Sequence, residues 1–264
     1  MESSEFHHAL ALLDWQIELG ATEALGDVPV NCYDLPARTE KPVAQAATPA
    51  VAATNAGVAS AAAPSVDAVD AARTAAEAAG TLDDLRQAMA GFDHCPLKKG
   101  ARNLVFSDGQ AGAPVMIVGE APGREEDREG RPFVGAAGQL LDRMFAAIGM
   151  GRTHEAAPVY ITNVLPWRPP QNRDPSPEEI AMMKPFLERH IALAKPEVLV
   201  VMGNISAHAL LGKRGITRLR GTWTEAHGLP VMPMCHPAYL LRNPAAKREA
   251  WADLLDIRAR VSGA

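Results

Sequence analysis

The sequence predicts an α/β fold in which helices cover both faces of a central, mostly parallel four-stranded sheet, a three-layer α/β/α arrangement. Short apolar runs of strand length alternate with longer segments of helical periodicity, which is the pattern of a parallel sheet flanked by helices. Three of the four runs lead directly into unusual polar segments, which should meet because the carboxyl ends of parallel strands share one sheet edge. The predicted strands are residues 115–118, 159–162, 198–202 and 230–234, and the predicted helices are residues 137–149, 176–194, 204–212 and 244–260.

The helix predicted for residues 176–194 has the clearest starting signal. Ser176 is a suitable N-cap and Pro177 fits the first turn. Glu179 stands where a capping-box carboxylate can accept a hydrogen bond from the N-cap backbone. An earlier helix is predicted by apolar residues at helical spacing, namely Leu82, Leu85, Met89 and Phe92.

The amino-terminal part should be organised separately from a main domain at residues 81–264. Residues 1–35 carry the period of an amphipathic helix, which could bind a protein partner or dock onto the rest of the chain. Residues 36–80 are rich in Ala and Pro and cannot bury enough apolar surface to fold, so we predict a flexible linker. Within it, residues 66–79 could form an Ala-rich helix. The apolar positions that set the amino-terminal period are Phe6, Leu10, Leu13 and Ile17.

The formal net charge of −5 is unevenly distributed over the 264 residues. Residues 1–81 hold 3 Lys/Arg against 11 Asp/Glu, a balance of −8, whereas residues 82–264 hold 23 against 20, a balance of +3. The main domain is therefore mildly basic, and local clusters matter more for an anionic partner than the total charge. Two clusters, which could equally be solvated surface charge, are Lys213, Arg214, Arg218 and Arg220, and Arg242, Lys247 and Arg248.

Signals for export or membrane insertion are not visible in the sequence. The first residues, from Met1 to Glu5, are acidic and lack the basic region of a signal peptide. The apolar runs are too short to span a bilayer. Cys32, Cys95 and Cys235 are too widely separated to indicate a disulfide framework or a paired metal motif. We therefore expect a cytoplasmic protein without membrane contact.

Three unusual segments carry the candidate chemistry. The first begins at residues 119–123, which read Gly-Glu-Ala-Pro-Gly and place one carboxylate at the end of a strand. It continues to residues 131–135, where the lone ring of Phe133 falls outside any helical or strand period. Together these features predict a pocket with one acid and one aromatic wall. The other segments are residues 163–173, which begin with Asn163, and residues 236–242, which begin with His236.

These three segments, in this order, resemble the family 4 uracil-DNA glycosylases, and the resemblance extends from about Leu82 to Arg258. It implies the uracil-DNA glycosylase fold, with the main domain as the catalytic domain. It further implies a monofunctional hydrolase that flips uracil out of DNA and hydrolyses its N-glycosidic bond to start base excision repair. We expect this chain to use water and no cofactor. We expect a monomer that acts on single- or double-stranded uracil-containing DNA and associates with a bacterial nucleoid.

The resemblance assigns catalytic roles to Glu120, Asn163 and His236. A carboxylate can stabilise the cation that develops on the sugar and can orient or deprotonate the water. The amide matches the O4 and N3–H edge of uracil, and the imidazole can donate to O2 of the leaving base. Without the resemblance, each could be an ordinary turn or loop residue. Phe133 would stack on the flipped base, and the implied uracil pocket consists of Gly119, Ala121, Phe133, Asn163 and His236.

Two further groups of residues belong to the expected site. Glu126 and Asp127 are alternative acids, although we expect them at a solvated helix start. An apolar wedge flanked by a cation suits insertion into a duplex, and one of the two adjacent leucines after Tyr239 should pack into the core instead. The expected DNA contacts are Asn172, Arg173, Arg218, Arg220, Tyr239, Leu240, Leu241 and Arg242.

One departure from the family pattern is large. Family 4 enzymes usually hold a four-iron, four-sulfur cluster, which needs four thiolates or close substitutes. The resemblance assigns the ligand positions to Phe92, Cys95, Trp167 and Met183, so one thiol remains. We predict a branch without the cluster or any metal, in which the three large apolar side chains fill its volume.

Two other functions stay open on the sequence alone. The chain could be a non-catalytic protein that binds damaged or single-stranded DNA on the same fold. Alternatively, residues 119–123 could be the phosphate loop of a nucleotide-binding domain, although they lack the Lys and Ser/Thr of a P-loop. Release of free uracil from DNA would distinguish the glycosylase from both.

Overall fold

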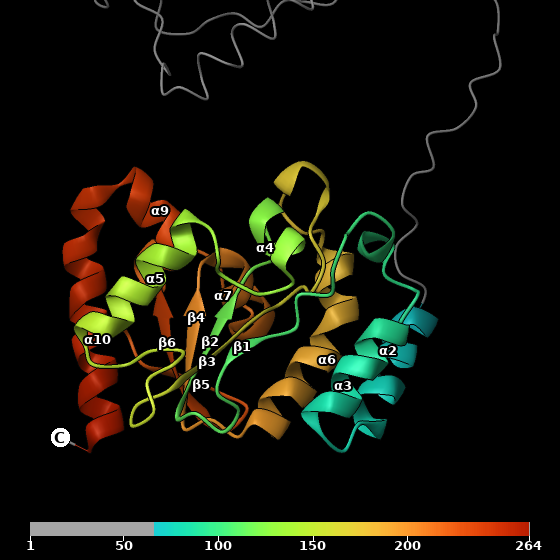
Figure 1. Ribbon diagram of the computed structural model, residues 1–264, viewed down its shortest axis with the longest axis horizontal. Coiled ribbons are helices and arrows are strands. Elements are labelled where there is room, and N and C mark those ends of the chain that lie inside the picture. The colour runs from blue at the N-terminus through green and yellow to red at the C-terminus, as the bar shows by residue number, and fades with distance from the viewer. Residues whose placement is uncertain (1–65, 264) are drawn as a thin grey trace, which may run out of the picture. The chain divides into compact units, whose positions relative to one another are not determined.

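The computed structural model describes residues 66–263, which form one sheet between two layers of helices (Figure 1). Four parallel strands lie at its centre in the order β3-β2-β4-β6 and match the predicted strands to within one residue at each end. An antiparallel strand borders each side, so the sheet has six strands where four were predicted. The strands are β1 (Asp108–Gly109), β2 (Val115–Gly119), β3 (Val159–Asn163), β4 (Val198–Met202), β5 (Thr224–Ala226) and β6 (Leu229–Met234).

The two layers of helices confirm the predicted three-layer α/β/α arrangement. Alternate strand residues face opposite layers: on β2, Met116 and Val118 join the apolar core beneath α2, α3 and α6, whereas Val115 and Ile117 join the core beneath α5 and α10. Each helix predicted within residues 66–263 is present, with its ends displaced by three residues or fewer. The helices are α2 (Val66–Ala78), α3 (Leu82–Gly91), α4 (Arg124–Glu129), α5 (Ala136–Ala147), α6 (Pro177–Ala194), α7 (Asn204–Leu211), α8 (Ile216–Leu219), α9 (Pro237–Arg242) and α10 (Lys247–Ser262).

Within residues 66–263, no helix has both the length and the apolar character needed to cross a membrane.

The capping box at the start of α6 is confirmed. The Ser176 hydroxyl accepts from Glu179 N at 3.2 Å, and the Glu179 carboxylate accepts from Ser176 N at 2.8 Å.

Helix α2 occupies part of the stretch that the composition assigned to a linker. It packs against α6. The Ala-rich helix considered possible for residues 66–79 is therefore present. The guanidinium of Arg189 on α6 donates to the Ala79 carbonyl from two nitrogens, at 2.9 and 2.6 Å. The helix at Val66–Ala78 therefore precedes the main-domain boundary predicted at residue 81, and the helix predicted in residues 1–35 lies outside the described residues. The buried contacts of this stretch come from alanines, namely Ala68, Ala72, Ala76 and Ala79.

The four positions that the resemblance assigns to cluster ligands lie in one apolar core. Phe92, Cys95, Trp167 and Met183 are each 5% exposed or less and belong to the same buried cluster. The Phe92 ring meets the Phe186 ring edge-on, with the centroids 5.2 Å apart. Apolar packing therefore joins the end of α3, the loop after β3 and the middle of α6.

Replacing Trp167 with Ala should lower the free energy of unfolding by about 3–5 kcal/mol, because a truncated core aromatic loses its contacts and leaves a cavity. Urea denaturation followed by circular dichroism measures the change. Trp251→Ala, at a position that is 43% exposed, is the matched control and should alter the unfolding free energy by about 0.5 kcal/mol or less. Equal effects of the two substitutions would show that Trp167 does not join these segments.

Candidate functional site

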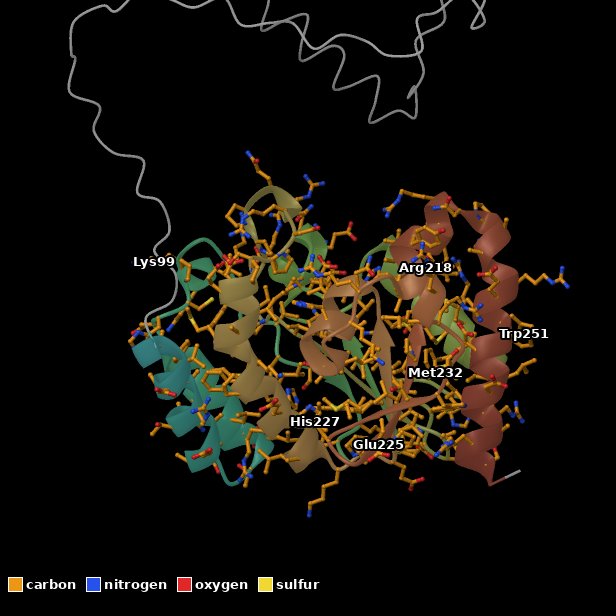
Figure 2. All side chains as sticks on the ribbon, turned by 180° about the vertical axis from the view of Figure 1, so that it is seen from behind. Lys99, Arg218, Glu225, His227, Met232 and Trp251 are labelled. Carbon is orange, nitrogen blue, oxygen red and sulfur yellow. The ribbon has the colours of Figure 1, made fainter. Side chains whose placement is uncertain are left out.

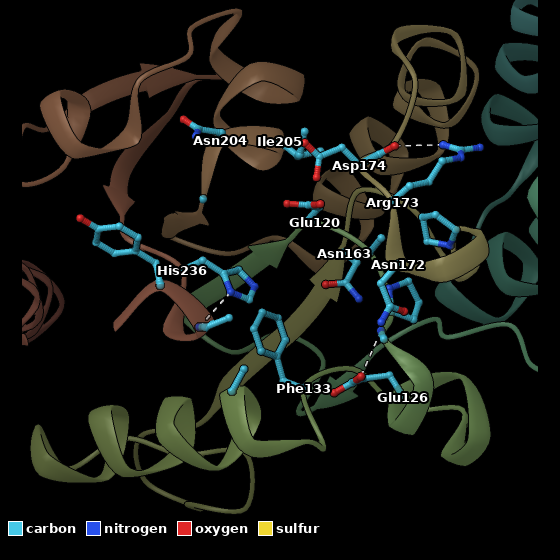
Figure 3. Close-up of a pocket in the computed structure, with 18 of the residues that line it drawn as sticks. Glu120, Glu126, Phe133, Asn163, Asn172, Arg173, Asp174, Asn204, Ile205 and His236 are labelled. Atoms are coloured by element: carbon cyan, nitrogen blue, oxygen red, sulfur yellow. Dashed lines mark hydrogen bonds between the residues drawn. The ribbon is translucent and has the colours of Figure 1, made fainter. Parts of the chain in front are cut away.

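A pocket of about 590 Å³ opens where the four central strands end (Figure 3). Each of these strands contributes to its lining: Glu120 follows β2, Asn163 ends β3, Gly203 follows β4 and His236 follows β6. Phe133 enters from the loop between α4 and α5. The sheet thus brings together residues that are more than a hundred positions apart in the chain, at the edge predicted from the strand directions.

The carboxyl group of Glu120 is partly buried in this pocket. Burial raises its pKa to about 7, and the nearby negative charge of Asp174 adds to the shift. Among residues 66–263, none donates a hydrogen bond to this carboxylate, while the Glu120 backbone carbonyl is fixed by Leu165 N at 3.0 Å. The acid is thus held in place by its backbone and keeps its oxygens available to a ligand or water.

Gly119 has no side chain, and the Phe133 ring and the Asn163 amide both lie in the space beside its Cα. Its Cα pairs with that of Asn163 across β2 and β3. A Cβ at position 119 would overlap the Asn163 Oδ1 atom and lie 2.6 Å from the Phe133 ring. Both of these side chains are buried, at 7% and 6% exposure. The pocket therefore requires glycine at this strand end.

His236 faces Phe133 and can donate a hydrogen bond in its neutral form. The two rings are stacked, with centroids 5.4 Å apart and planes inclined by 26°. The His236 Nδ1 atom accepts from Ala238 N at 3.2 Å as the N-cap of α9, which leaves the proton on Nε2. Burial lowers the pKa of this imidazole to about 4, with a smaller contribution from Arg242. At neutral pH the ring is uncharged and can donate through Nε2–H.

These geometric observations agree with the comparison to known proteins. A sequence profile described as the uracil DNA glycosylase superfamily matches residues 106–255. The chain belongs to the uracil-DNA glycosylase superfamily.

Several relatives within this superfamily are similar over most of their own length. The chain is 41% identical over 182 residues to a type-4 uracil-DNA glycosylase from Pyrobaculum aerophilum, covering 66% of this chain and 91% of the relative. It is 39% identical over 186 residues to one from Archaeoglobus fulgidus, covering 67% and 92%. It is 42% identical over 152 residues to one from Thermotoga maritima, covering 56% and 77%. The resemblance read from the sequence is thus confirmed at the level of the superfamily.

Glu126 and Asp127 lie in the first turn of α4, as expected, but their carboxylates are bound by backbone amides and not solvated. The Glu126 carboxylate accepts from the amides of Gly123, Val134 and Gly135 at 2.9–3.0 Å. Asp127 is 5% exposed and accepts from the amide of Arg102 at 2.8 Å. Glu126, which lines the pocket, fixes the loop after Phe133, and Asp127 fixes the loop at Arg102. Sequence reasoning missed this role because several of the partner amides lie eight to 25 residues away.

Six of the eight residues expected to contact DNA line the pocket or are exposed. Asn172, Arg173, Tyr239 and Arg242 line the pocket, and Arg218 is exposed on α8 (Figure 2). Leu241 is 41% exposed whereas Leu240 is 1% exposed, so one leucine packs into the core as expected.

Arg220 is more enclosed than Arg173, which also pairs with a buried carboxylate: the Arg220 side chain is 17% exposed, whereas that of Arg173, beside Glu179, is 46% exposed. The Arg220 guanidinium pairs with the buried carboxylate of Asp253 and donates to the Glu249 carbonyl at 2.9 Å. Its positive charge is thereby committed to joining α8 to α10. Arg220 and Leu240 are thus part of the internal packing, and the proposed DNA surface excludes them.

Sequence reasoning also missed part of the pocket wall. Asp174 belongs to the loop before α6, and Asn204 and Ile205 begin α7 (Figure 3). These residues follow no recognisable motif, since their placement depends on how the loops after β3 and β4 return to the sheet. Asp174 matters because its charge disfavours ionisation of Glu120.

We expect the Glu120 carboxyl to titrate near pH 7 and Asp174→Asn to lower its pKa, because a neutral amide no longer repels the ionised form. Carbon-13 NMR of labelled glutamate measures both values.

The folded-state pKa of Glu120 lies above the unfolded value of 4.5. The stability that Glu120 contributes is therefore complete below pH 4.5 and is lost as pH rises through about 7. Glu120→Gln should therefore gain stability relative to the native protein between about pH 5 and pH 8. A Glu120 pKa near 4.5 would contradict this account.

Proposed function

We propose that this protein flips uracil out of DNA and hydrolyses its N-glycosidic bond, the first step of base excision repair. The observation that carries the proposal is the convergence of Glu120, Phe133, Asn163 and His236 on one pocket of a uracil-DNA glycosylase superfamily chain. A carboxylate, an aromatic face, an amide and a neutral imidazole donor are the groups that release of uracil requires. The enzyme is a monofunctional hydrolase that uses water.

Bond cleavage separates charge, and two of these residues act on opposite sides of the breaking bond. The sugar becomes cationic, so an ionised Glu120 stabilises it and orients or deprotonates the attacking water. The uracil leaves as an anion, which the Nε2–H of His236 stabilises by donating to O2. Because His236 is neutral before the reaction, it can donate without first placing a positive charge in the buried pocket.

Recognition of the base depends on the other two residues. The Asn163 amide can donate to O4 and accept from N3–H, whereas cytosine presents the opposite pattern at these atoms. The amide is buried at the strand end beside Gly119, which limits its ability to turn and read cytosine. Phe133 stacks on the base, a contact worth roughly 1–3 kcal/mol.

The proposed DNA surface surrounds the mouth of the pocket. Leu241, exposed on the short helix α9, enters the space that the flipped base vacates, with Tyr239 and Arg242 beside it. Asn172 and Arg173 contact DNA from the opposite loop, and Arg218 adds a phosphate contact. Since one chain supplies every residue of the pocket, we propose a monomer. We further propose that it acts at the nucleoid and that residues 1–35 bind a protein partner.

Release of free uracil from an oligonucleotide tests the function. The native protein should release the base, with a rate that rises through about pH 7 as Glu120 ionises. Glu120→Gln should slow release by about 10²- to 10⁴-fold while leaving DNA binding largely intact, because it changes charge but not shape. Glu225→Gln, an exposed position on β5, is the control and should match the native rate. Binding of uracil-containing DNA without release by the native protein would favour the non-catalytic alternative.

We also propose that the fold is maintained without an iron–sulfur cluster. The donor set does not fit one: Cys95 is a single thiol among Phe92, Trp167 and Met183, and burial raises its pKa to about 11. No group of three or more His, Cys, Asp or Glu residues within 66–263 is arranged to hold a metal ion. The same segments that a cluster would join are joined by apolar contacts.

Purified protein should be colourless and contain neither stoichiometric iron nor acid-labile sulfide, because three of the four ligand positions cannot bind iron. Metal analysis and visible absorption measure this. Anaerobic incubation with iron and sulfide should leave both readings unchanged, and Cys95→Ser should contain as little iron as the native protein. Stoichiometric iron and sulfide in the native protein would overturn the proposal.

A further inference from the structure

Arg152 holds the loop that carries Phe133, although it is not among the residues that line the pocket. It lies between α5 and β3, and its side chain is 12% exposed. Its Nη1 atom donates to the Pro132 carbonyl at 2.8 Å and its Nη2 atom donates to the Phe133 carbonyl at 2.6 Å. One guanidinium thus fixes two consecutive carbonyls of the loop.

Two carboxylates fix the guanidinium in turn. Asp142 on α5 accepts from Arg152 Nε at 2.7 Å, and Asp108 on β1 accepts from Nη1 at 2.8 Å. A guanidinium presents several donors in a rigid plane, which suits this set of four acceptors, whereas a lysine ammonium cannot span them. The Phe133 loop is therefore tied to both a helix and the sheet edge.

Phe133 needs such support because its backbone is strained. Its φ angle is +54°, in the left-handed region that non-glycine residues rarely adopt. The following amides, Val134 N and Gly135 N, both donate to Glu126 Oε1. A Cβ at Gly138 would overlap the Phe133 carbonyl, so α5 packs directly against the strained residue. Arg152 fixes the carbonyl side of Phe133 and Glu126 fixes the amide side of the next residues.

We propose that Arg152 is a positioning residue that sets the orientation of the Phe133 ring toward His236 and the pocket. The inference rests on the proposed function, in which this ring stacks on the flipped base. Without the guanidinium, two carbonyls and two carboxylates lose their shared partner. The loop can then relax from its left-handed conformation, and the ring leaves its place against Gly119 and His236.

A double-mutant cycle on uracil release from single-stranded DNA tests the inference. Arg152→Met should lower kcat/KM about tenfold, the loss expected from one misplaced base stack. In a Phe133→Ala background, Arg152→Met should cause no further loss, because the ring through which it acts is gone. Arg152→Lys retains the positive charge beside Asp108 and Asp142. It should still lower kcat/KM nearly as much as Arg152→Met, because an ammonium cannot reach all four acceptors. Arg258→Met removes a single bond to the Ile148 carbonyl and is the matched control, with an unchanged kcat/KM.

A second measurement does not depend on activity. The Phe133 ring should shift the His236 ring-proton NMR signals through its ring current. This shift should be lost in Phe133→Ala and in Arg152→Met or Arg152→Lys, but retained in Arg258→Met. An Arg152→Met loss of equal size in both Phe133 backgrounds, or unchanged His236 signals in folded Arg152 variants, would overturn the inference. Failure of the native protein to release uracil would instead overturn the proposed function, while the NMR result would still decide the role of Arg152.

Discussion

The pocket depends on a hydrogen atom where any other residue would carry a carbon. Gly119 ends β2 at the centre of the sheet, and the Phe133 ring and the Asn163 amide occupy the space beside its Cα. The neighbouring strand supplies the amide and a distant loop supplies the ring, so both depend on this single clearance. Contacts from Glu126, Gly138 and Arg152 then hold Phe133 in a left-handed backbone conformation, which is unfavourable for a residue other than glycine.

Burial shifts the pKa values of Glu120 and His236 in opposite directions, with one result. It raises the pKa of Glu120 and lowers that of His236, so both groups are shifted toward their uncharged forms. An uncharged His236 beside Phe133 suits an uncharged base. Charge then develops on the reacting groups in a low-dielectric space, where each electrostatic contact is stronger than in water.

Much of the fold could be predicted from the sequence because its signals are local. The central strands are apolar on both faces, and the α6 capping box lies within four residues, from Ser176 to Glu179. Roles that depend on distant partners left no such signal. Asp127 accepts from amides 24 and 25 residues away, and Arg220 pairs with Asp253 across 33 residues. An acidic helix start and a basic cluster look the same in sequence whether they face solvent or a buried partner.

The candidate site divides along the same line. Glu120, Asn163 and His236 could be found because each follows a strand in a segment of unusual composition. The position of Asp174 could not be predicted, since an acid before a helix is common and only the returning loop brings it toward Glu120. The edge strands β1 and β5 contain two and three residues, too few for an alternating pattern to appear.

The apolar junction at Phe92, Trp167 and Met183 has a consequence for how such a chain can change over generations. Hydrophobic side chains of similar volume usually replace one another in a core at a cost below about 1.5 kcal/mol. The junction can therefore drift one residue at a time while the other contacts keep the segments joined. A junction built from coordinate bonds lacks this freedom, because losing one ligand affects all the others. Descendants of this chain could therefore differ at all three positions and still hold the loop after Asn163 against α6.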